Sequence, residues 1–533
     1  MQRIGAVVLG LIALTLVGSG IGAASADIQI AGVHPQPVTV GNDGEYIRFV
    51  ASNPTDVSGW EVTDGYRNAT FPDTTVNGTI VASTEPAVAS LLTTDPVIPL
   101  NGSLRLAAAG DELTLRDSDD LVVDRFTYPD TPDGKKWTRS ESGVVETPRY
   151  ATDWTFDTHS SVPVMAFVLP DNPAVPVEPI ANATDRVYLA GYELSDPAVV
   201  SALMSAADNG ATVRVVVDGG PVGGQMANEF DALDLLIAHG IDVRVRTGER
   251  DPYRFHHPKY AVVDDTAIIM TENWKMAGTG GASSRGWGMW LEDPRLASDL
   301  ATVFATDFHG PPSVAWTRHR TTVEPREGDA PYATYPARIG TSSIEADRVT
   351  LSIGPEMVTA QKVSVIRNAT ESIQVQQVSI GDLSFPLLQE LIDAARDGVH
   401  VQLLVDASWY VSTENQLLAK TLDQKAAQED LAFETRLIES GDAFEKTHVK
   451  GMIVDEEVVY IGSTNWNNVS LNQNREVGIL IEDPAVARYY SRVFAVDWRG
   501  TTWDTPAEFG LVAVVTWASS GLIAARRLQF DPN

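Results

Sequence analysis

Apolar and polar positions change their spacing along the chain, and these changes predict its domains. Between residues 27 and 162, short apolar runs alternate with turns rich in Gly, Asn, Asp and Pro, a pattern typical of a β-sandwich. Beyond residue 180, apolar residues recur at helical spacing and lead into continuous apolar runs, which are typical of strands buried on both faces. We therefore expect an all-β domain followed by α/β structure.

The α/β pattern occurs twice. The helical apolar positions of residues 199–207 recur at 387–395, and each helix leads through a Gly into an apolar strand that ends in Asp. We therefore predict one α/β unit over residues 180–310 and a second over 346–503. Residues 311–345 are rich in Pro, Arg and Thr without clear periodicity, which indicates a linker or an irregular surface segment.

The two ends of the chain predict export and a membrane anchor. Residues 1–26 carry Arg3, then an apolar stretch, then small residues, as in a secretory signal peptide. The uncharged run 509–525 is just long enough to span a bilayer, and Arg526 and Arg527 follow it, which favours a cytoplasmic C-terminus. We expect a surface-anchored chain with its catalytic domains outside; the alternatives are an uncleaved N-terminal anchor and a buried C-terminal helix.

Composition narrows the possible chemistry. The 533 residues include 71 acidic and 39 basic side chains, a net charge of -32, and no cysteine. Disulfides and thiolate metal sites are therefore excluded, and no His-rich cluster has ligand spacing, so we expect no metal and no cofactor. Such acidity would ordinarily repel nucleic acid and anionic lipid. Dispersed acidic residues and few lysines are typical of proteins from brine, where charges are screened over ~3 Å at 1 M salt, so we interpret the acidity as an adaptation to salt.

One motif, His-x-Lys-x4-Asp, occurs at matching places in both repeats. Residues two apart on a strand point to one face, so each imidazole and ammonium can contact the same phosphate. We expect the aspartates to brace the motifs rather than to touch the substrate. The candidate catalytic residues are His257, Lys259, Asp264, His448, Lys450 and Asp455.

Small and polar residues follow each motif. The second repeat continues with Gly462-Ser463-Thr464-Asn465, and the first with Met270-Thr271-Glu272-Asn273, which lacks the glycine. Hydroxyl and amide groups can donate hydrogen bonds to phosphate oxygens. The candidate substrate-binding residues are therefore Thr271, Asn273, Ser463 and Asn465.

Together these motifs resemble the phospholipase D superfamily over residues 180–500. The resemblance implies two mixed β-sheets flanked by helices, with both motifs in one cleft on a pseudo-twofold axis, and phosphodiester chemistry without a metal. It also implies that His257 is the nucleophile, which forms a phosphohistidine, and that His448 is the acid and base. The sequence alone would allow the reverse assignment.

The resemblance adds one site residue and raises one question. Glu476 matches a family position whose carboxylate orients a catalytic histidine, but the aligned residue in the first repeat is Gly286. One imidazole therefore lacks an evident partner. Glu272 or Glu292 could replace it, and either could equally be an ordinary surface carboxylate.

Residues 27–162 resemble the lamin-tail domain, an immunoglobulin-like sandwich. The resemblance rests on the stretch 45–49, on Ser58-Gly59-Trp60, on residues 110–113 and on Trp137. It implies a module that binds a partner or positions the enzyme and has no catalytic role.

Three functions follow from these observations. We expect a membrane-anchored phosphodiesterase that hydrolyses phospholipids or transfers their phosphatidyl group, as cardiolipin synthases do. A nuclease of the same family is the second hypothesis, although acidic residues interrupt the basic segments 244–254 and 318–326. The third is a surface-binding protein with a vestigial cleft, because Met270 and Gly286 depart from the family pattern. The expected partners are a phospholipid or other phosphodiester and a membrane, with nucleic acid as the alternative.

Overall fold

The computed structural model describes residues 28–500, apart from 38, 40–42, 91, 94, 132–133, 141–142, 148–153, 155, 249–250, 311 and 329–332. The expected signal peptide and C-terminal membrane helix lie outside the described residues. Within the part of the chain that is described, no helix is both long enough and apolar enough to cross a membrane.

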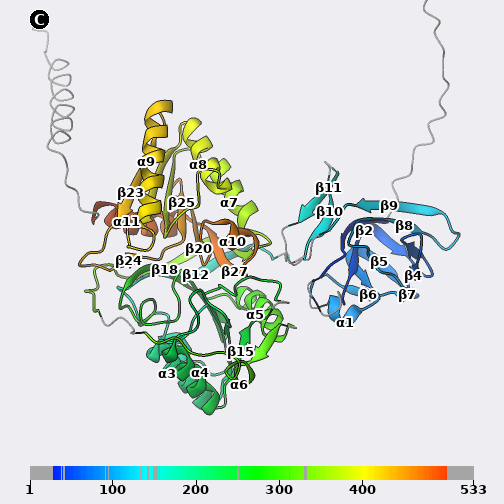
Figure 1. Cartoon of the computed structure of the whole chain (residues 1–533), viewed down its shortest axis with the longest axis horizontal. Helices are drawn as coiled ribbons and strands as arrows, with labels where there is room; N and C mark the ends of the chain where they lie inside the picture. Colours follow the sequence, from blue (N-terminus) through cyan, green and yellow to red (C-terminus); the bar gives the residue numbers. More distant parts are fainter. Residues whose placement is uncertain are drawn as a thin grey trace, which may run out of the picture.

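The N-terminal region is rich in strands and forms its own body (Figure 1). Its elements are β1 (Ile28–His34), β2 (Tyr46–Asp56), β3 (Glu61–Thr63), β4 (Asn68–Thr70), β5 (Thr75–Ser83), α1 (Pro86–Ala89), β6 (Val97–Pro99), β7 (Asn101–Ser103), β8 (Asp111–Arg116), β9 (Val122–Tyr128), β10 (Lys136–Ser140) and β11 (Gly143–Thr147). They form two sheets, ordered β11-β10-β1-β2-β5-β6 and β7-β4-β3-β8-β9. Phe49, Phe71 and Leu113 belong to one apolar core to which both sheets contribute. The strand-rich character was expected from the sequence, and the lamin-tail resemblance stays a prediction.

The remaining chain forms two units, each with strands and helices in alternation. The first contains β12 (His159–Leu169), α2 (Glu178–Ala181), β13 (Arg186–Gly191), α3 (Pro197–Asp208), β14 (Thr212–Asp218), α4 (Ala227–Ala238), β15 (Asp242–Arg246), β16 (Tyr260–Val263), β17 (Thr266–Met270), β18 (Ser284–Leu291), α5 (Pro294–His309), β19 (Ser313–Ala315) and α6 (Trp316–His319). The second contains β20 (Ser342–Gly354), α7 (Val358–Arg367), β21 (Ser372–Gln377), α8 (Pro386–Arg396), β22 (His400–Asp406), α9 (Ser412–Glu429), β23 (Phe433–Ile438), β24 (Lys446–Thr447), β25 (Gly451–Val454), β26 (Val458–Gly462), α10 (Asn468–Asn472), β27 (Glu476–Glu482) and α11 (Pro484–Gly500).

One continuous sheet runs through both units. Its order is β19-β15-β14-β13-β16-β17-β18-β12-β20-β27-β26-β25-β21-β22-β23. The strands of the second unit repeat the order of the first in reverse, and the two units join where β12 pairs antiparallel with β20. Each half contains parallel and antiparallel neighbours, so the expected mixed sheets and tandem units are confirmed.

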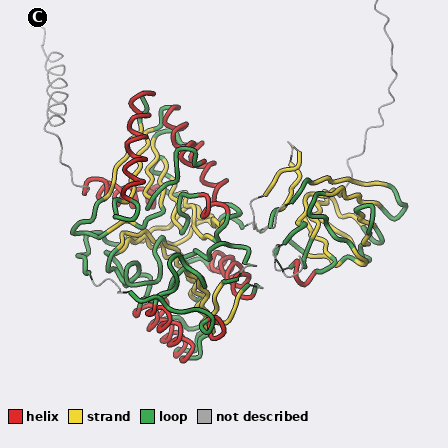
Figure 2. The backbone as a smooth tube through the Cα atoms, in the orientation of Figure 1, coloured by secondary structure: helices red, strands yellow, loops and turns green. Residues whose placement is uncertain are grey.

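Helices cover both faces of this sheet, with strands in the middle of the body and helices toward its outside (Figure 2). Helices α5 and α11 pack on one face and contribute to a single apolar core that runs through both units. The opposite face carries α3 and α4 in the first unit and α7, α8 and α9 in the second, each group with its own core. The shared core holds the two halves together.

The repeated Asp-Pro dipeptides explain why α5 and α11 begin where they do. Asp293 accepts hydrogen bonds from the N–H groups of Arg295 and Leu296, and Asp483 accepts from those of Ala485 and Val486. The proline occupies the first helical position, where its missing N–H is not needed. Such caps stabilise a helix by about 1 kcal/mol each, so the sequence specifies both starts locally.

The structure moves two of the expected boundaries. The β-sandwich was expected to extend to residue 162, but β12 begins at His159 and pairs with β18 and β20 in the large sheet. The reason is that the apolar run of residues 162–169 forms a central strand, which the local pattern cannot distinguish from a sandwich strand. The expected linker 311–345 contains β19 and α6, and β19 pairs with β15 of the first unit.

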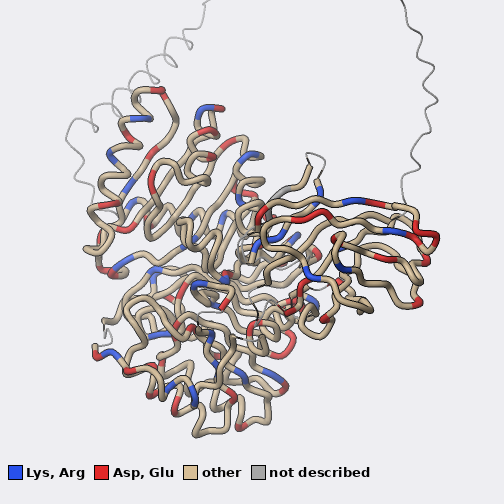
Figure 3. The backbone as a smooth tube through the Cα atoms, turned by 45° about the vertical axis from the view of Figure 1, so that its right-hand side comes forward, with Lys and Arg blue, Asp and Glu red and all other residues tan. Residues whose placement is uncertain are grey.

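Charged residues are spread along both bodies. Figure 3 shows Asp and Glu positions throughout the described backbone, with Lys and Arg interspersed among them. This distribution agrees with the dispersed acidity seen in the sequence.

Candidate active site

Each His-x-Lys pair lies on an extended segment that leads into a strand of the large sheet. His257 and Lys259 precede β16, and His448 and Lys450 precede β25. Lys259 Nζ donates to the carbonyl oxygen of His257 at 2.7 Å, and Lys450 Nζ donates to that of His448 at 2.8 Å. Both lysines are fully buried, while the His257 and His448 side chains remain 9% and 21% exposed. The imidazoles are therefore reachable from solvent, and the ammonium groups lie behind them.

Each histidine is held in place by the opposite unit. The N–H of His257 donates to the carbonyl oxygen of Arg475 at 3.0 Å, and the N–H of His448 donates to that of Arg285 at 2.8 Å. Strand β24, just before His448, also pairs with β18 of the first unit. The two motifs, far apart in sequence, thus meet at the junction of the units.

A carboxylate from the second unit orients His257. Glu476 Oε2 lies 2.9 Å from His257 Nδ1, and the same carboxylate accepts hydrogen bonds from Ser463 Oγ and from Asn474 Nδ2. Burial would raise the pKa of Glu476, but the charges of His257 and Lys259 and these hydrogen bonds bring it below its usual value. An ionised carboxylate at Nδ1 fixes the ring and leaves Nε2 as the nitrogen available to a substrate.

The partner of His448 is Glu272. Its Oε2 lies 3.1 Å from His448 Nδ1, and it occupies the space that a side chain at position 286 would need. A Cβ on Gly286 would lie 2.2 Å from Glu272 Cγ. The carboxylate that the first repeat lacks at position 286 is therefore supplied from position 272. Glu292, the other candidate, is exposed just beyond the far end of β18.

The two carboxylates are held differently. Glu476 is bonded by three side chains, whereas Oε1 of the buried Glu272 has no hydrogen-bond partner among the described residues. Burial raises the pKa of Glu272 to about 7, although Lys450 and Lys446 oppose the rise. The Glu272–His448 pair can therefore hold a proton near neutral pH, while Glu476 is ionised.

Burial also lowers the pKa values of the basic groups. It brings the pKa of His257 to about 4, against the effect of Glu476, and the pKa of Lys259 to about 7. The pKa of His448 and that of Lys450 fall well below their usual values for the same reason. An anion bound here would favour the charged forms of these groups, so the site is suited to a phosphate. Among the described residues, no cluster of three His, Asp or Glu side chains could hold a metal ion.

The predicted substrate-binding residues have different environments. Thr271 Oγ1 and Ser463 Oγ accept hydrogen bonds from backbone N–H groups of the neighbouring strand, and both residues are fully buried. Asn273 Nδ2 donates to Glu193 at 3.0 Å. Asn465 is partly exposed and belongs to the same turn as Ser463. The two hydroxyls therefore hold the turns in shape, and Ser463 also donates to Glu476, the partner of His257.

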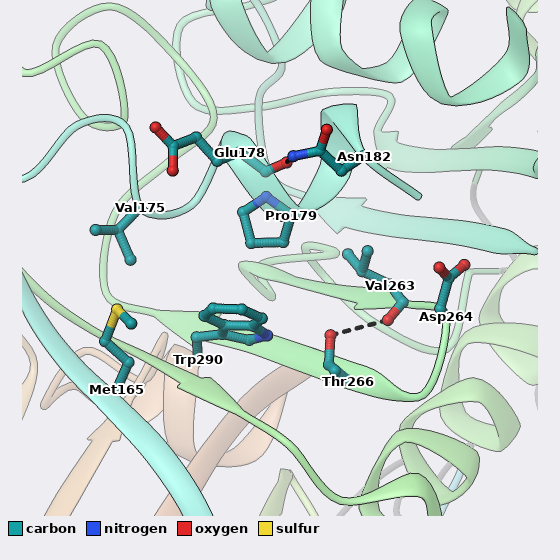
Figure 4. Close-up of a pocket in the computed structure, with 9 residues that line it drawn as sticks. All are labelled: Met165, Val175, Glu178, Pro179, Asn182, Val263, Asp264, Thr266 and Trp290. Carbon is teal, nitrogen blue, oxygen red and sulfur yellow. Dashed lines mark hydrogen bonds between the residues drawn. The ribbon is translucent and has the colours of Figure 1, made fainter. Parts of the chain in front are cut away.

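Asp264 and Asp455 lie away from this cluster, at the far ends of β16 and β25. Each carboxylate accepts backbone N–H bonds from three successive residues, 184–186 for Asp264 and 370–372 for Asp455. Asp264 lines a separate hollow of about 360 Å³, and no histidine or lysine of the motifs lines it. Figure 4 shows the nine residues that do. Burial would raise the pKa of both aspartates, but these N–H donors keep it below its usual value. A whole strand separates them from the histidines, which is the placement expected of residues that brace the motifs.

Two buried arginines connect the units reciprocally and were not recognised from the sequence. Arg285 of the first unit pairs with Asp497 of α11 at 3.2 Å, and Arg475 of the second pairs with Asp307 of α5 at 3.2 Å. Asp307 and Asp497 occupy equivalent places in the two repeats, and this recurrence is a sequence signal that could have identified them. Their arginine partners could not be identified in this way, because each lies in the opposite repeat. Because these arginines also hold the histidine backbones, the ion pairs fix the relative positions of the motifs.

Both tryptophans that follow the site turns are structural. Trp274 and Trp466 are fully buried, and Trp274 Nε1 donates to the carbonyl oxygen of Ala190 at 3.0 Å. Met270, which stands in the first repeat where the second has Gly462, is also fully buried in the core. Its side chain therefore packs in the core and does not face solvent.

Comparisons with known proteins agree with this architecture. The family model described as "Cardiolipin synthase, PLD-like domain" matches residues 177–308 and again 363–498. The chain is 30% identical over 112 residues to a Caenorhabditis elegans protein named probable phospholipase D. The aligned segment covers 21% of this chain and 19% of that protein.

Several solved structures are similar to this chain, among them the following two. Phosphatidylserine synthase from Haemophilus influenzae has 14% identity and a TM-score of 0.48, covering 68% of this chain and 94% of that one. The phospholipase D family member Nuc from Salmonella typhimurium has 19% identity and a TM-score of 0.26, covering 29% and 97%. With a family model that matches both halves, and with both motifs at their junction, the chain belongs to the phospholipase D superfamily, whose members are phosphodiesterases and phospholipid transferases.

Proposed function

We propose that the protein is an exported, membrane-anchored phosphodiesterase that cleaves or exchanges phospholipid phosphodiesters through a phosphohistidine. One observation carries the proposal. His257 and His448 lie at the junction of the units, each backed by a buried lysine and each bonded at Nδ1 by a carboxylate of the opposite unit. Two imidazoles in matched surroundings can act in turn on one phosphorus.

The first half-reaction transfers the phosphatidyl group to the protein. Lys259 and Lys450 offset the charge of the non-bridging oxygens, which grows in the transition state. His257 Nε2 attacks phosphorus as the bond to the leaving oxygen breaks, and His448 donates its proton to that oxygen. The products are the headgroup alcohol and a phosphohistidine.

The second half-reaction restores the enzyme. His448, now neutral, accepts a proton from water or from a second alcohol, whose oxygen attacks phosphorus while the P–N bond breaks. Water gives phosphatidic acid, and an alcohol gives a new phosphodiester. The choice of acceptor decides between hydrolysis and exchange.

The surroundings of the two histidines support this assignment of roles. The ionised Glu476 stabilises the positive charge that develops on His257 during attack. The Glu272–His448 pair retains a proton near neutral pH, as a general acid requires. These differences favour His257 as nucleophile and His448 as acid and base.

The cellular placement rests on the sequence patterns at the chain ends. Residues 1–26 resemble a signal peptide, and the apolar run 509–525 with its following arginines favours a C-terminal anchor. In that arrangement the site stays close to a lipid surface, and the N-terminal strand-rich domain serves as a positioning module.

The substrate can be tested with the full chain in high salt. It should release headgroup from phosphatidylcholine or phosphatidylglycerol vesicles, and added glycerol should yield an exchanged lipid. His257→Ala should abolish both reactions, while His400→Ala, which changes an exposed histidine on β22, should keep them. Cleavage of single-stranded DNA without any reaction on lipid would instead identify a nuclease, and no cleavage of either would favour a binding protein.

A further inference from the structure

Two equivalent loops, one from each unit, expose apolar side chains beside the histidines. The loop after β14 carries Val222, which is 78% exposed, and the loop after β22 carries Trp409 and Tyr410, which are 89% and 43% exposed. Both strands end in a buried aspartate at matching positions, Asp218 and Asp406. The two loops are therefore related by the same duplication as the motifs.

The first loop rests on the surroundings of His257. The N–H of Val222 donates to Tyr192 Oη at 2.6 Å. The ring of Tyr192 contacts the imidazole of His257 edge-on, with centroids 4.7 Å apart, and Lys259 Nζ lies 5.5 Å from the centre of the same ring. A single tyrosine thus separates this loop from the nucleophile.

The second loop rests on the surroundings of His448. Tyr410 Oη donates to Asp406 at 3.3 Å, and Asp406 accepts from the N–H of Thr447, the residue before His448, also at 3.3 Å. Lys446 Nζ lies 5.5 Å from the centre of the Tyr410 ring. The exposed indole of Trp409 packs edge-on against the ring of Tyr410, with centroids 5.8 Å apart.

The chemistry of these side chains fits a lipid interface. Trp and Tyr combine an apolar ring with a polar tip and are enriched where bilayers meet water. Lys446 supplies a cation beside the rings for a lipid phosphate. The exposed Val222 offers no ring on which a nucleobase could stack, which favours a lipid over a polynucleotide as the occupant.

Resting on the function proposed above, we propose that Val222, Trp409 and Tyr410 form a docking rim that enters the headgroup layer of a phospholipid bilayer and presents the lipid phosphodiester to the two histidines. One part of the rim comes from each unit, and each part is linked through one side chain to a residue at or next to a histidine. Its role is to hold the cleft against the membrane surface.

Site-specific labelling tests the rim without requiring any turnover. The chain contains no cysteine, so Val222→Cys can carry the only environment-sensitive dye in the full protein. Phosphatidylcholine vesicles should shift the dye emission to the blue, and adding Trp409→Ala should reduce that shift, because the loop then enters the headgroup layer less often even though the expected anchor 509–525 keeps the chain on the vesicle. Tyr66→Cys, at a residue 96% exposed in the N-terminal domain, is the matched control and should show no shift.

The outcomes separate the rim from the proposed reaction. A shift at position 222 but not at 66 supports the rim even if no lipid is turned over, in which case only the proposed function fails. Equal shifts at both positions, or none at position 222, would overturn the rim. A shift caused by single-stranded DNA but not by vesicles would overturn it as well and would indicate nucleobase stacking on Trp409.

Discussion

Replacing Glu272 with Gln tests the most unusual feature of the site. The substitution keeps the shape of the side chain and removes the charge that faces His448 Nδ1 at 3.1 Å. Without the carboxylate, the imidazolium of His448 loses its neutralising partner, and the amide can hold the ring in the wrong tautomer. General acid and base catalysis contributes about 10²- to 10⁴-fold, so kcat should fall by that factor, which corresponds to about 3–5 kcal/mol.

The pH dependence of the rate gives a second, independent readout. Burial raises the pKa of Glu272 to about 7, so the proton shared with His448 is present below that pH and lost as pH rises through it. The rate of the unmodified protein should therefore decline above about 7. In Glu272→Gln only His448 can hold the proton, and it binds that proton more weakly without an anion beside it. The decline should move to lower pH.

Steady-state kinetics over a range of pH would provide the measurement, with thermal melting to confirm that each variant folds. Glu292→Gln is the matched control, because it changes an exposed glutamate near the end of the same strand, β18. It should retain the activity and pH profile of the unmodified protein. An unchanged kcat and profile in Glu272→Gln, or an equal loss in both variants, would refute the assignment.

Three further predictions concern the rest of the site. The rate should fall as pH drops through about 4, because protonation of His257 removes the attacking lone pair, and the acid limb of the kcat/KM profile checks this. Asp455→Asn should lower the free energy of unfolding in urea by about 1 kcal/mol with kcat nearly unchanged, because solvent screens this partly exposed carboxylate. Since backbone N–H donors lower the pKa of Asp455 in the folded state, this contribution is present above the unfolded pKa and is lost as pH falls through the folded one. Arg475→Ala should cost about 3–5 kcal/mol in the same assay by leaving the Asp307 carboxylate buried without its partner, and a loss below 1 kcal/mol, on the order of a surface pair, would contradict this.

The duplication and the helix starts were accessible from the sequence because local signals specify them. The apolar spacing, the Gly that ends each helix and the Asp-Pro caps all act over a few residues. The position of β12 was not accessible, because the central place of a strand depends on its partners β18 and β20. Those partners lie more than one hundred residues away in sequence, and no local pattern identifies them.

In the site, residue types could be predicted but not all of their partners. The two-residue spacing alone predicts that His257 and Lys259 point to one face of a strand. The repeat then identifies the second pair, His448 and Lys450. The choice between Glu272 and Glu292 was open, because both are glutamates near Gly286 in sequence. Only the fold shows that Glu272 fills the space beside that glycine.

For the aspartates of the motif, the sequence pattern suggests more than the structure shows. Asp264 belongs to the motif by spacing, yet strand β16 lies between it and Lys259. At about 3.3 Å per residue, five residues of extended chain separate groups by about 16 Å, so a shared motif does not imply a shared site. Its three backbone N–H bonds explain why an aspartate suits that position.

Trapping the covalent intermediate tests the central claim most directly. His448→Ala can be incubated with an aryl phosphodiester, whose leaving group needs no proton, and the digested protein analysed by mass spectrometry. The account predicts a phosphorylated peptide containing His257 that accumulates because no base activates water, and its absence in His257→Ala. Turnover without any adduct on His257, or an adduct on another residue, would contradict the account.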